Sequence, residues 1–127
     1  MTECDVNEPS SNVAVLRGVV RGDPTIRELA SGGAIAQFDV ATTIGSATTT
    51  VRVVVPVAWP EPSASSTAWL VEAMELVVVG TVRRRFFRVG GATQSRTEVV
   101  ADTVVPARRR KQAAAAVTDA LARITAA

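Results

Sequence analysis

Four arginines surround two phenylalanines in the stretch VRRRFFRVGG, residues 82–91. A guanidinium group pairs bidentately with phosphate and stacks on flat rings, so this mixture indicates a surface for planar or phosphate-bearing partners. The alternative is a solvated strand edge that blocks aggregation, but such an edge needs only one or two charges and usually carries lysine. The number and type of the charges therefore favour binding.

Phe86 and Phe87 are consecutive in a predicted strand and must point to opposite faces of it. Only one of them can lie on a given binding face. The other is expected to pack inside the fold or against a partner subunit.

The composition predicts one folded domain without enzymatic activity. The chain has 127 residues, of which 47% are hydrophobic, and arginine supplies 13 of its 14 basic residues. It contains no histidine or tyrosine, and its acidic residues show no metal-ligand spacing, so we expect no catalytic residue, metal or cofactor. A catalytic pair of carboxylates that the fold brings together from distant parts of the chain stays an open alternative. The single Cys4 and the lack of a long apolar run predict a cytoplasmic protein without a membrane span.

The elements that must position the arginine-rich stretch are mostly strands. Valine-rich segments begin at residues 12, 48 and 75, RGDPT at 21–25 is typical of a turn, and Ser31-Gly32-Gly33 joins a hairpin. Residues 60–74 offer a serine cluster and about two helical turns, with Trp69, Leu70 and Ala73 facing inward. Gly18 predicts a bulge or sharp bend, and Pro56 an edge position or bulge.

The resulting order is three strands, a helix and two strands. This order is typical of an all-β OB-fold, a five-stranded Greek-key barrel whose outer face and loops bind oligonucleotides or oligosaccharides. A compact β-sandwich would give a similar order of strands and helix along the chain. We predict three segments: a flexible N-terminal leader (1–11), the OB-fold domain with one internal helix (12–106), and a basic linker with a C-terminal helix (107–127).

The segment NVAVLRGVVRGDPTIRELASGGAIAQFDVAT, followed by VVPVAW, VVVGTVRRRFF and SRTEVV, resembles bacterial single-stranded DNA-binding proteins over residues 12–105. The resemblance implies an OB-fold, sequence-tolerant binding of single-stranded DNA in replication, repair or recombination, and a homo-oligomer, with a tetramer favoured over a dimer. Single-stranded RNA is not distinguished from DNA. The family's acidic tail ending in Pro-Phe, which recruits partners, has no counterpart, so the chain resembles an accessory member.

The resemblance also implies the candidate binding residues. Trp59 and Phe87 match aromatics that stack on bases, with arginines beside them for the phosphates. This chain departs from the family at three positions. Val53 stands where the family has an aromatic residue in its third strand, and the loop TIGSAT lacks the aromatic that the family carries after its second strand. Ala73 replaces the family's glycine after the helix. The full candidate set is Trp59, Phe87, Arg83, Arg84, Arg85, Arg88, Arg52 and Arg96.

Two alternatives remain at this point. Trp59 is followed by Pro60, and the alternative to base stacking is that its ring packs at the end of the barrel. Phe38 and Trp69 are expected in the core. The whole chain has a second interpretation as an OB-fold interaction or assembly subunit with weak or no DNA binding, which the missing aromatics favour. In the tail, Val117, Leu121 and Ile124 predict an amphipathic helix that docks on the barrel or on a neighbouring subunit.

Overall fold

The computed structural model describes residues 10–126, so most of the predicted leader lies outside the described part. Five strands form the body of the protein: β1 (Ala14–Glu28), β2 (Ala34–Gly45), β3 (Thr50–Pro60), β4 (Glu75–Val89) and β5 (Ala92–Pro106). They are joined by a short 3-10 helix, η1 (Ala64–Ala68), and followed by one α-helix, α1 (Arg110–Thr125). No helix within residues 10–126 has the length and apolar character needed to cross a bilayer.

The strands close into a barrel in the order β1-β2-β3-β5-β4. Neighbouring strands are antiparallel except for β3 and β5, which run parallel and pair only at Val57 with Val99 and Ala58 with Val100. This five-stranded closed topology is the OB-fold, and the predicted fold class is confirmed. Pro56 lies just before the β3–β5 contact and pairs only with β2, which is the edge position expected for a proline.

The barrel interior is filled by alternate aliphatic residues of the strands. Val20, Val40, Leu76 and Val78 are at most 1% exposed, and Phe38 and Trp69 join the same core as predicted. The bulge predicted at Gly18 is absent, because pairing with β4 runs regularly through that residue. Glycine is needed there for another reason: a Cβ atom would lie 2.4 Å from the carbonyl oxygen of Ala41.

The predicted internal helix is reduced to the single 3-10 turn η1. Beyond it the backbone bonds to β1 instead of continuing a helix: Ala73 N donates to Val20 O, and Val20 N donates to Met74 O, both at 2.9 Å. Trp69 and Leu70 are buried as expected, but Ala73 is exposed and adopts a left-handed backbone with φ 73°. The sequence missed this because the pairing partner, β1, lies about 50 residues away in the chain.

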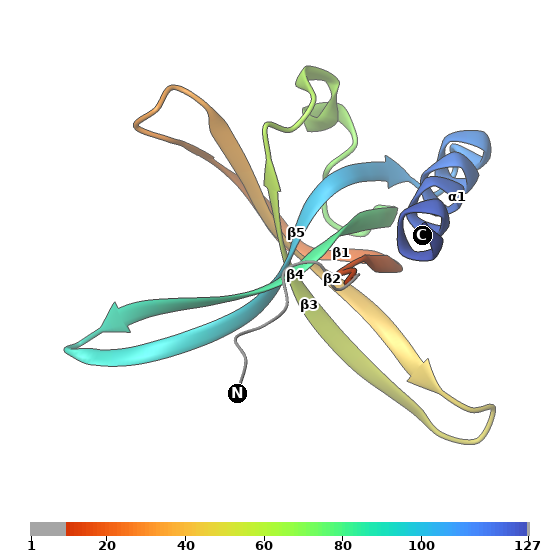
Figure 1. Ribbon diagram of the computed structural model, residues 1–127, viewed down its shortest axis with the longest axis horizontal. Helices are drawn as coiled ribbons and strands as arrows, with labels where there is room; N and C mark the ends of the chain where they lie inside the picture. Colours follow the sequence, from red (N-terminus) through yellow and green to blue (C-terminus); the bar gives the residue numbers. More distant parts are fainter. Residues whose placement is uncertain (1–9, 127) are drawn as a thin grey trace.

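The predicted turn at RGDPT is also wrong, since β1 continues through it with a register shift between Arg21 and Thr25. The chain reverses later, at the predicted glycine pair, where Leu29 N donates to Gly33 O at 2.8 Å. As a result, three long two-stranded arms project from the barrel in different directions, formed by β1–β2, β2–β3 and β4–β5 (Figure 1).

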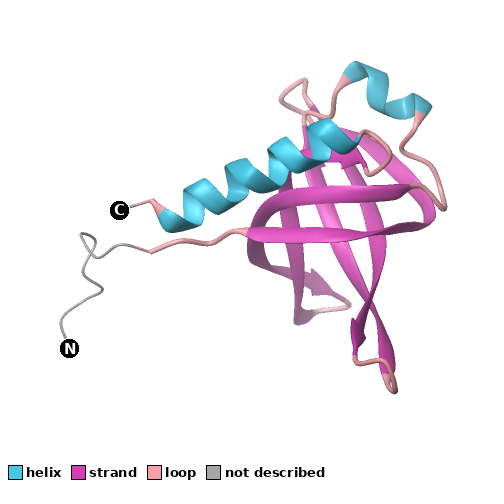
Figure 2. Cartoon of the chain, turned by 90° about the vertical axis from the view of Figure 1, so that its right-hand side faces the viewer, coloured by secondary structure: helices cyan, strands magenta, loops and turns pink. Residues whose placement is uncertain are grey.

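Helix α1 confirms the predicted C-terminal helix and packs along the barrel beside β4 and β5 (Figure 2). Its contact face consists of alanines, with Ala120 only 2% exposed, and Arg123 Nη1 donates to Asp102 Oδ2 at 3.0 Å. The predicted apolar stripe does not dock on the barrel of its own chain, because Val117, Leu121 and Ile124 remain 42%, 60% and 50% exposed, and docking on a neighbouring subunit stays a prediction. Small side chains dock the helix instead, since they allow its backbone to approach the strands closely.

Candidate nucleic-acid interface

The arginine-rich stretch lies on the β4–β5 arm, beyond the point where these strands leave the barrel. The strands pair in register to the tip, with Arg85 opposite Arg96 and Phe87 opposite Gln94. The tip is a two-residue turn in which Gly90 and Gly91 have φ values of 56° and 82°. Positive φ at both positions matches the twist of a hairpin and requires glycine or a similar residue.

Asn12 fixes the base of this arm. Its side-chain amide donates to Val82 O at 2.8 Å and accepts from Val82 N at 2.9 Å. The amide thereby extends the β1–β4 ladder beyond its last backbone pair, Ala14 with Gly80. The start of the domain is thus bonded to the residue at which the arginine-rich stretch begins.

One face of the arm carries Arg83, Arg85 and Phe87, and its charge is partly neutralised. The Glu98 carboxylate is only 3% exposed; it accepts a 2.5 Å hydrogen bond from Arg83 Nη2 and lies 3.8 Å from Arg85 Nε. The Arg85 guanidinium also lies over the half-buried ring of Phe87, 5.8 Å from its centroid. Arg83 and Arg85 therefore have internal partners, which sequence reasoning did not anticipate.

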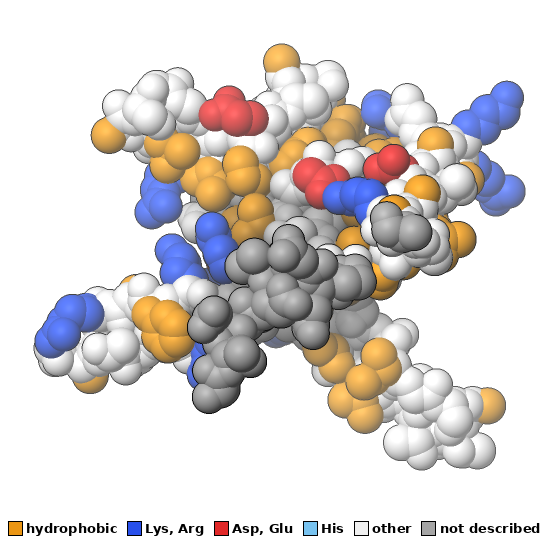
Figure 3. All heavy atoms as spheres, viewed as in Figure 1, with side chains coloured by type: hydrophobic (Ala, Val, Ile, Leu, Met, Phe, Trp, Pro, Cys, Tyr) orange, Lys and Arg blue, Asp and Glu red, His pale blue; other side chains and the backbone are white. Residues whose placement is uncertain are grey.

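The opposite face carries Arg84, Phe86 and Arg88 and is open to solvent. Phe86 is 65% exposed, with the Arg84 guanidinium 5.6 Å from its ring centroid. Arg84 donates to Ser95 Oγ and Arg88 to Gly91 O, and neither forms an ion pair with the described residues. Packing of Phe86 inside the fold, one of its two expected environments, is wrong because this part of β4 extends beyond the barrel, where no core covers the ring. Figure 3 shows basic and apolar side chains next to each other along this arm.

Trp59 lies in the core and does not offer a ring face for stacking. It is 6% exposed, pairs with Ala36 on the inward side of β3, and its ring centroid lies 6.0 Å from that of Trp69. Trp69 is in turn covered by the Arg109 guanidinium at 5.8 Å. The packing alternative therefore describes Trp59 in this chain, and the expected stacking position is corrected accordingly.

The remaining two candidates lie at different places on the barrel. Arg52 is exposed on the β2–β3 arm, opposite Thr43, and so is not brought together with the β4–β5 arginines. Arg96 sits on β5 and places its Nη2 atom 3.8 Å from Asp39 Oδ1 of β2. Arg96 thus connects the β4–β5 arm to the outer face of the barrel.

A polar groove of about 360 Å³ lies on that outer face, between the β1–β2 arm and Arg96. β1 contributes Arg21, Asp23 and Thr25, and β2 contributes Gln37 and Asp39. Sequence reasoning missed Arg21, because the adjacent Gly-Asp-Pro was interpreted as a turn and not as a bulge within β1. The β1–β2 and β4–β5 loops and the face of β2 and β3 are where OB-folds bind oligonucleotides.

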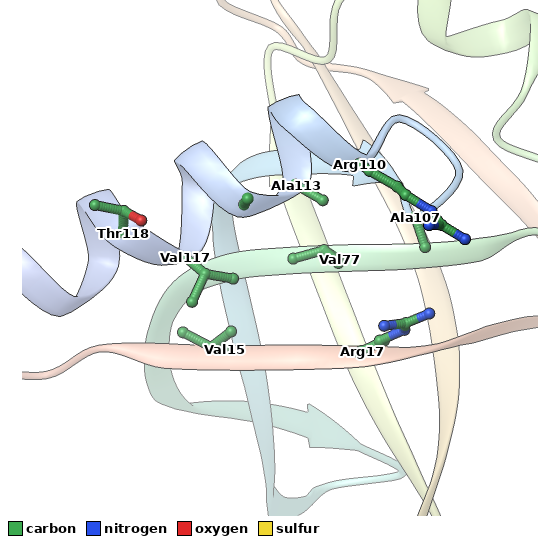
Figure 4. Close-up of a pocket in the computed structure, with 9 residues that line it drawn as sticks. Val15, Arg17, Val77, Ala107, Arg110, Ala113, Val117 and Thr118 are labelled. Atoms are coloured by element: carbon green, nitrogen blue, oxygen red, sulfur yellow. The ribbon is translucent and has the colours of Figure 1, made fainter.

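A larger groove of about 650 Å³ lies away from this surface, between α1 and strands β1 and β4 (Figure 4). Val15, Val77, Ala113 and Val117 give it apolar walls, and Arg17 and Arg110 lie at one end. Arg17 Nε donates to Glu75 Oε2 at 2.9 Å, and this hydrogen bond raises the pKa of Arg17 above its ordinary value. Arg17 is therefore charged and paired.

The described residues contain no group of three or more acidic, cysteine or histidine side chains able to hold a metal ion. No protein-family model and no curated protein matches the sequence. The fold is similar to that of the Plasmodium falciparum SSB in a solved complex with ssDNA, with a TM-score of 0.65 and 20% identity. The match covers 75% of this chain and 89% of that one, which supports the OB-fold independently of the strand pattern.

Proposed function

We propose that this chain binds single-stranded DNA through the β4–β5 arm and the adjoining polar groove. The observation that carries the proposal is the exposed face of the arm, where Phe86 lies under Arg84 and beside Arg88, and where no carboxylate of the described residues pairs with either arginine. Bases stack on aromatic rings regardless of sequence, while arginines contact the phosphates. The fold shared with an SSB in complex with ssDNA supports the same function.

The two phenylalanines contribute differently in this proposal. Phe86 is the accessible stacking ring, and Phe87, which is half-buried under Arg85, contributes one partly open face. The second stacking position therefore moves from Trp59 to the arm itself. Protection of single strands during replication, repair or recombination is the cellular role that such binding would serve.

Fluorescence-anisotropy titration of labelled oligo-dT, with duplex DNA for comparison, tests this function. Phe86→Ala is expected to weaken oligo-dT binding by about 1 to 3 kcal/mol without changing its salt dependence, because it removes stacking and no charge. Phe87→Ala is expected to have a smaller effect on binding. Val89→Ala, a truncation of another exposed apolar residue near the tip, is the matched control and should bind like the parent. Equal binding by the parent and Phe86→Ala would exclude the stacking platform.

The burial of Trp59 favours a second function, an OB-fold assembly subunit with weak or no DNA binding. With Trp59 in the core and Val53 on β3, the β3 strand offers no exposed aromatic ring among the described residues. A parent protein that binds neither oligo-dT nor oligo-dC at low salt would support this function and exclude the first.

A further inference from the structure

Asp39 occupies an unusual position for an acidic residue, in the floor of the polar groove beside two arginines. It lies on the outer side of β2, directly opposite Arg21 of β1, and 3.8 Å from Arg96 of β5. That distance exceeds a hydrogen bond, and the Asp39 side chain is 45% exposed. Asp39 is therefore ion-paired with Arg96 without a hydrogen bond between them, and its half-exposed carboxylate can accept one from a ligand in the groove.

A carboxylate repels phosphate, so Asp39 opposes the binding of a nucleic-acid backbone at this point. The two flanking arginines attract phosphate, which places the backbone to either side of Asp39. The part of a single strand that can then face the carboxylate is a base edge. Unpaired bases present their hydrogen-bonding edges freely, and an acidic side chain accepts a hydrogen bond from the N4 amino group of cytosine.

We propose that Asp39 gives the groove a preference for cytosine over thymine, an inference that rests on the proposed single-strand binding. The two pyrimidines are similar in size, and at the 4-position cytosine carries an amino donor where thymine carries a carbonyl acceptor. The carboxylate attracts the first and repels the second. Gln37, two residues earlier on the same face, does not discriminate, because its amide both donates and accepts.

The stacking surface and the groove then have separate tasks. Phe86 and the arginines of the arm bind any single strand, and Asp39 adds a preference at one nucleotide. One good contact between an acidic side chain and a base is worth roughly a fivefold to hundredfold discrimination. We expect the lower end of that range, because Asp39 is half-exposed.

Titration of the full chain with oligo-dC and oligo-dT of equal length, at pH 8 and one salt concentration, tests the proposal. The parent is expected to bind oligo-dC roughly five to ten times more tightly than oligo-dT. Asp39→Asn removes the charge and, like Gln37, presents an amide that both donates and accepts, so the preference for oligo-dC should fall toward equal binding of the two oligonucleotides. Asp23→Asn, in the same groove, is the control for charge alone and should strengthen both by the same factor.

The outcomes separate this inference from the proposed function. If the parent binds both oligonucleotides equally, the proposed role of Asp39 is overturned and single-strand binding is left intact. The parent protein alone is enough for this test. A change of the same factor for both oligonucleotides in Asp39→Asn also overturns it, because Asp39 would then act only through charge or through the placement of Arg96. A parent that binds neither oligonucleotide overturns the proposed function itself.

Discussion

At the scale of single residues, the arginines of one short stretch differ in what they already contact. Arg83 bonds to the buried Glu98, whereas Arg84 lies over Phe86 and, among residues 10–126, bonds only to the hydroxyl of Ser95. A phosphate that binds Arg83 must compete with an internal carboxylate. Neighbouring arginines with identical chemistry are therefore expected to serve different purposes.

Substitution of these two arginines should produce two different defects. Arg84→Ala is expected to flatten the slope of log affinity against log salt for oligo-dT by roughly 0.7, because one phosphate contact is lost. Arg83→Ala should instead lower the free energy of unfolding by about 1.5 to 3 kcal/mol, because the buried Glu98 carboxylate loses its charged hydrogen-bond donor and keeps only the more distant Arg85. Salt-dependent titrations and thermal melts of both variants measure the two effects. Identical salt slopes and melting temperatures for the two would contradict the assignment.

The sequence predicted the chemistry of these residues better than their environment. The alternation of side chains in a strand separates Phe86 from Phe87, but it does not say which of the two faces of the arm is more exposed to solvent. That choice depends on Glu98, which reaches Arg83 from the opposite strand, 15 residues away in the chain. The same limit applies to Trp59, which lies in the core with its ring beside that of Trp69, a residue of the segment after η1.

At the scale of elements, the strands were predictable because valine-rich segments and glycine turns are local signals. The segment after η1 was not predictable in this way. Its backbone bonds to Val20 of β1, and this pairing forces Ala73 into a left-handed conformation. A residue with a Cβ atom is strained there by about 1 to 2 kcal/mol. A glycine at this position would have the backbone freedom that the bend requires.

Ala73→Gly is therefore expected to stabilise the protein. Relief of the strain should exceed the added entropy of the unfolded chain and raise the free energy of unfolding by roughly 0.5 to 1 kcal/mol. The same substitution at Ala115, exposed in the middle of α1, should lower the free energy of unfolding by about 1 kcal/mol, because glycine is a poor helix former. Urea denaturation of both variants gives the two signs. A loss of stability in Ala73→Gly would show that the bend does not strain the backbone.

At the scale of the whole molecule, an exposed apolar surface lies on the side of α1. Val15 of β1 and Val117, Leu121 and Ile124 of α1 are each at least 42% exposed around the larger groove. The helix both walls the groove and carries apolar side chains beyond it. We propose that the chain self-associates through this surface, with a second copy covering the exposed apolar side chains.

Leu121→Glu is expected to reduce the mass of the protein in solution toward that of a monomer, because it buries a charge in this contact. Leu29→Glu, at the exposed end of the β1–β2 arm, is the matched control and should leave the mass unchanged. Sedimentation velocity at micromolar concentrations measures both. A monomeric parent would contradict self-association, and an unchanged mass in Leu121→Glu would place the contact elsewhere.

The narrow contact between β3 and β5 has a consequence for the order of folding. Every other pair of neighbouring strands has at least six paired positions, whereas β3 and β5 join at two, between residues more than 40 positions apart in the chain. Hairpins close short loops quickly, whereas the β1–β4 and β3–β5 contacts both close long loops at a greater entropic cost, which β1–β4 offsets with six paired positions and β3–β5 with only two. The three arms should therefore form early, and closure of the barrel at Val57 and Val99 should come last. Separation of β3 from β5 would then be the first step of unfolding, so the strength of this junction would set the unfolding rate.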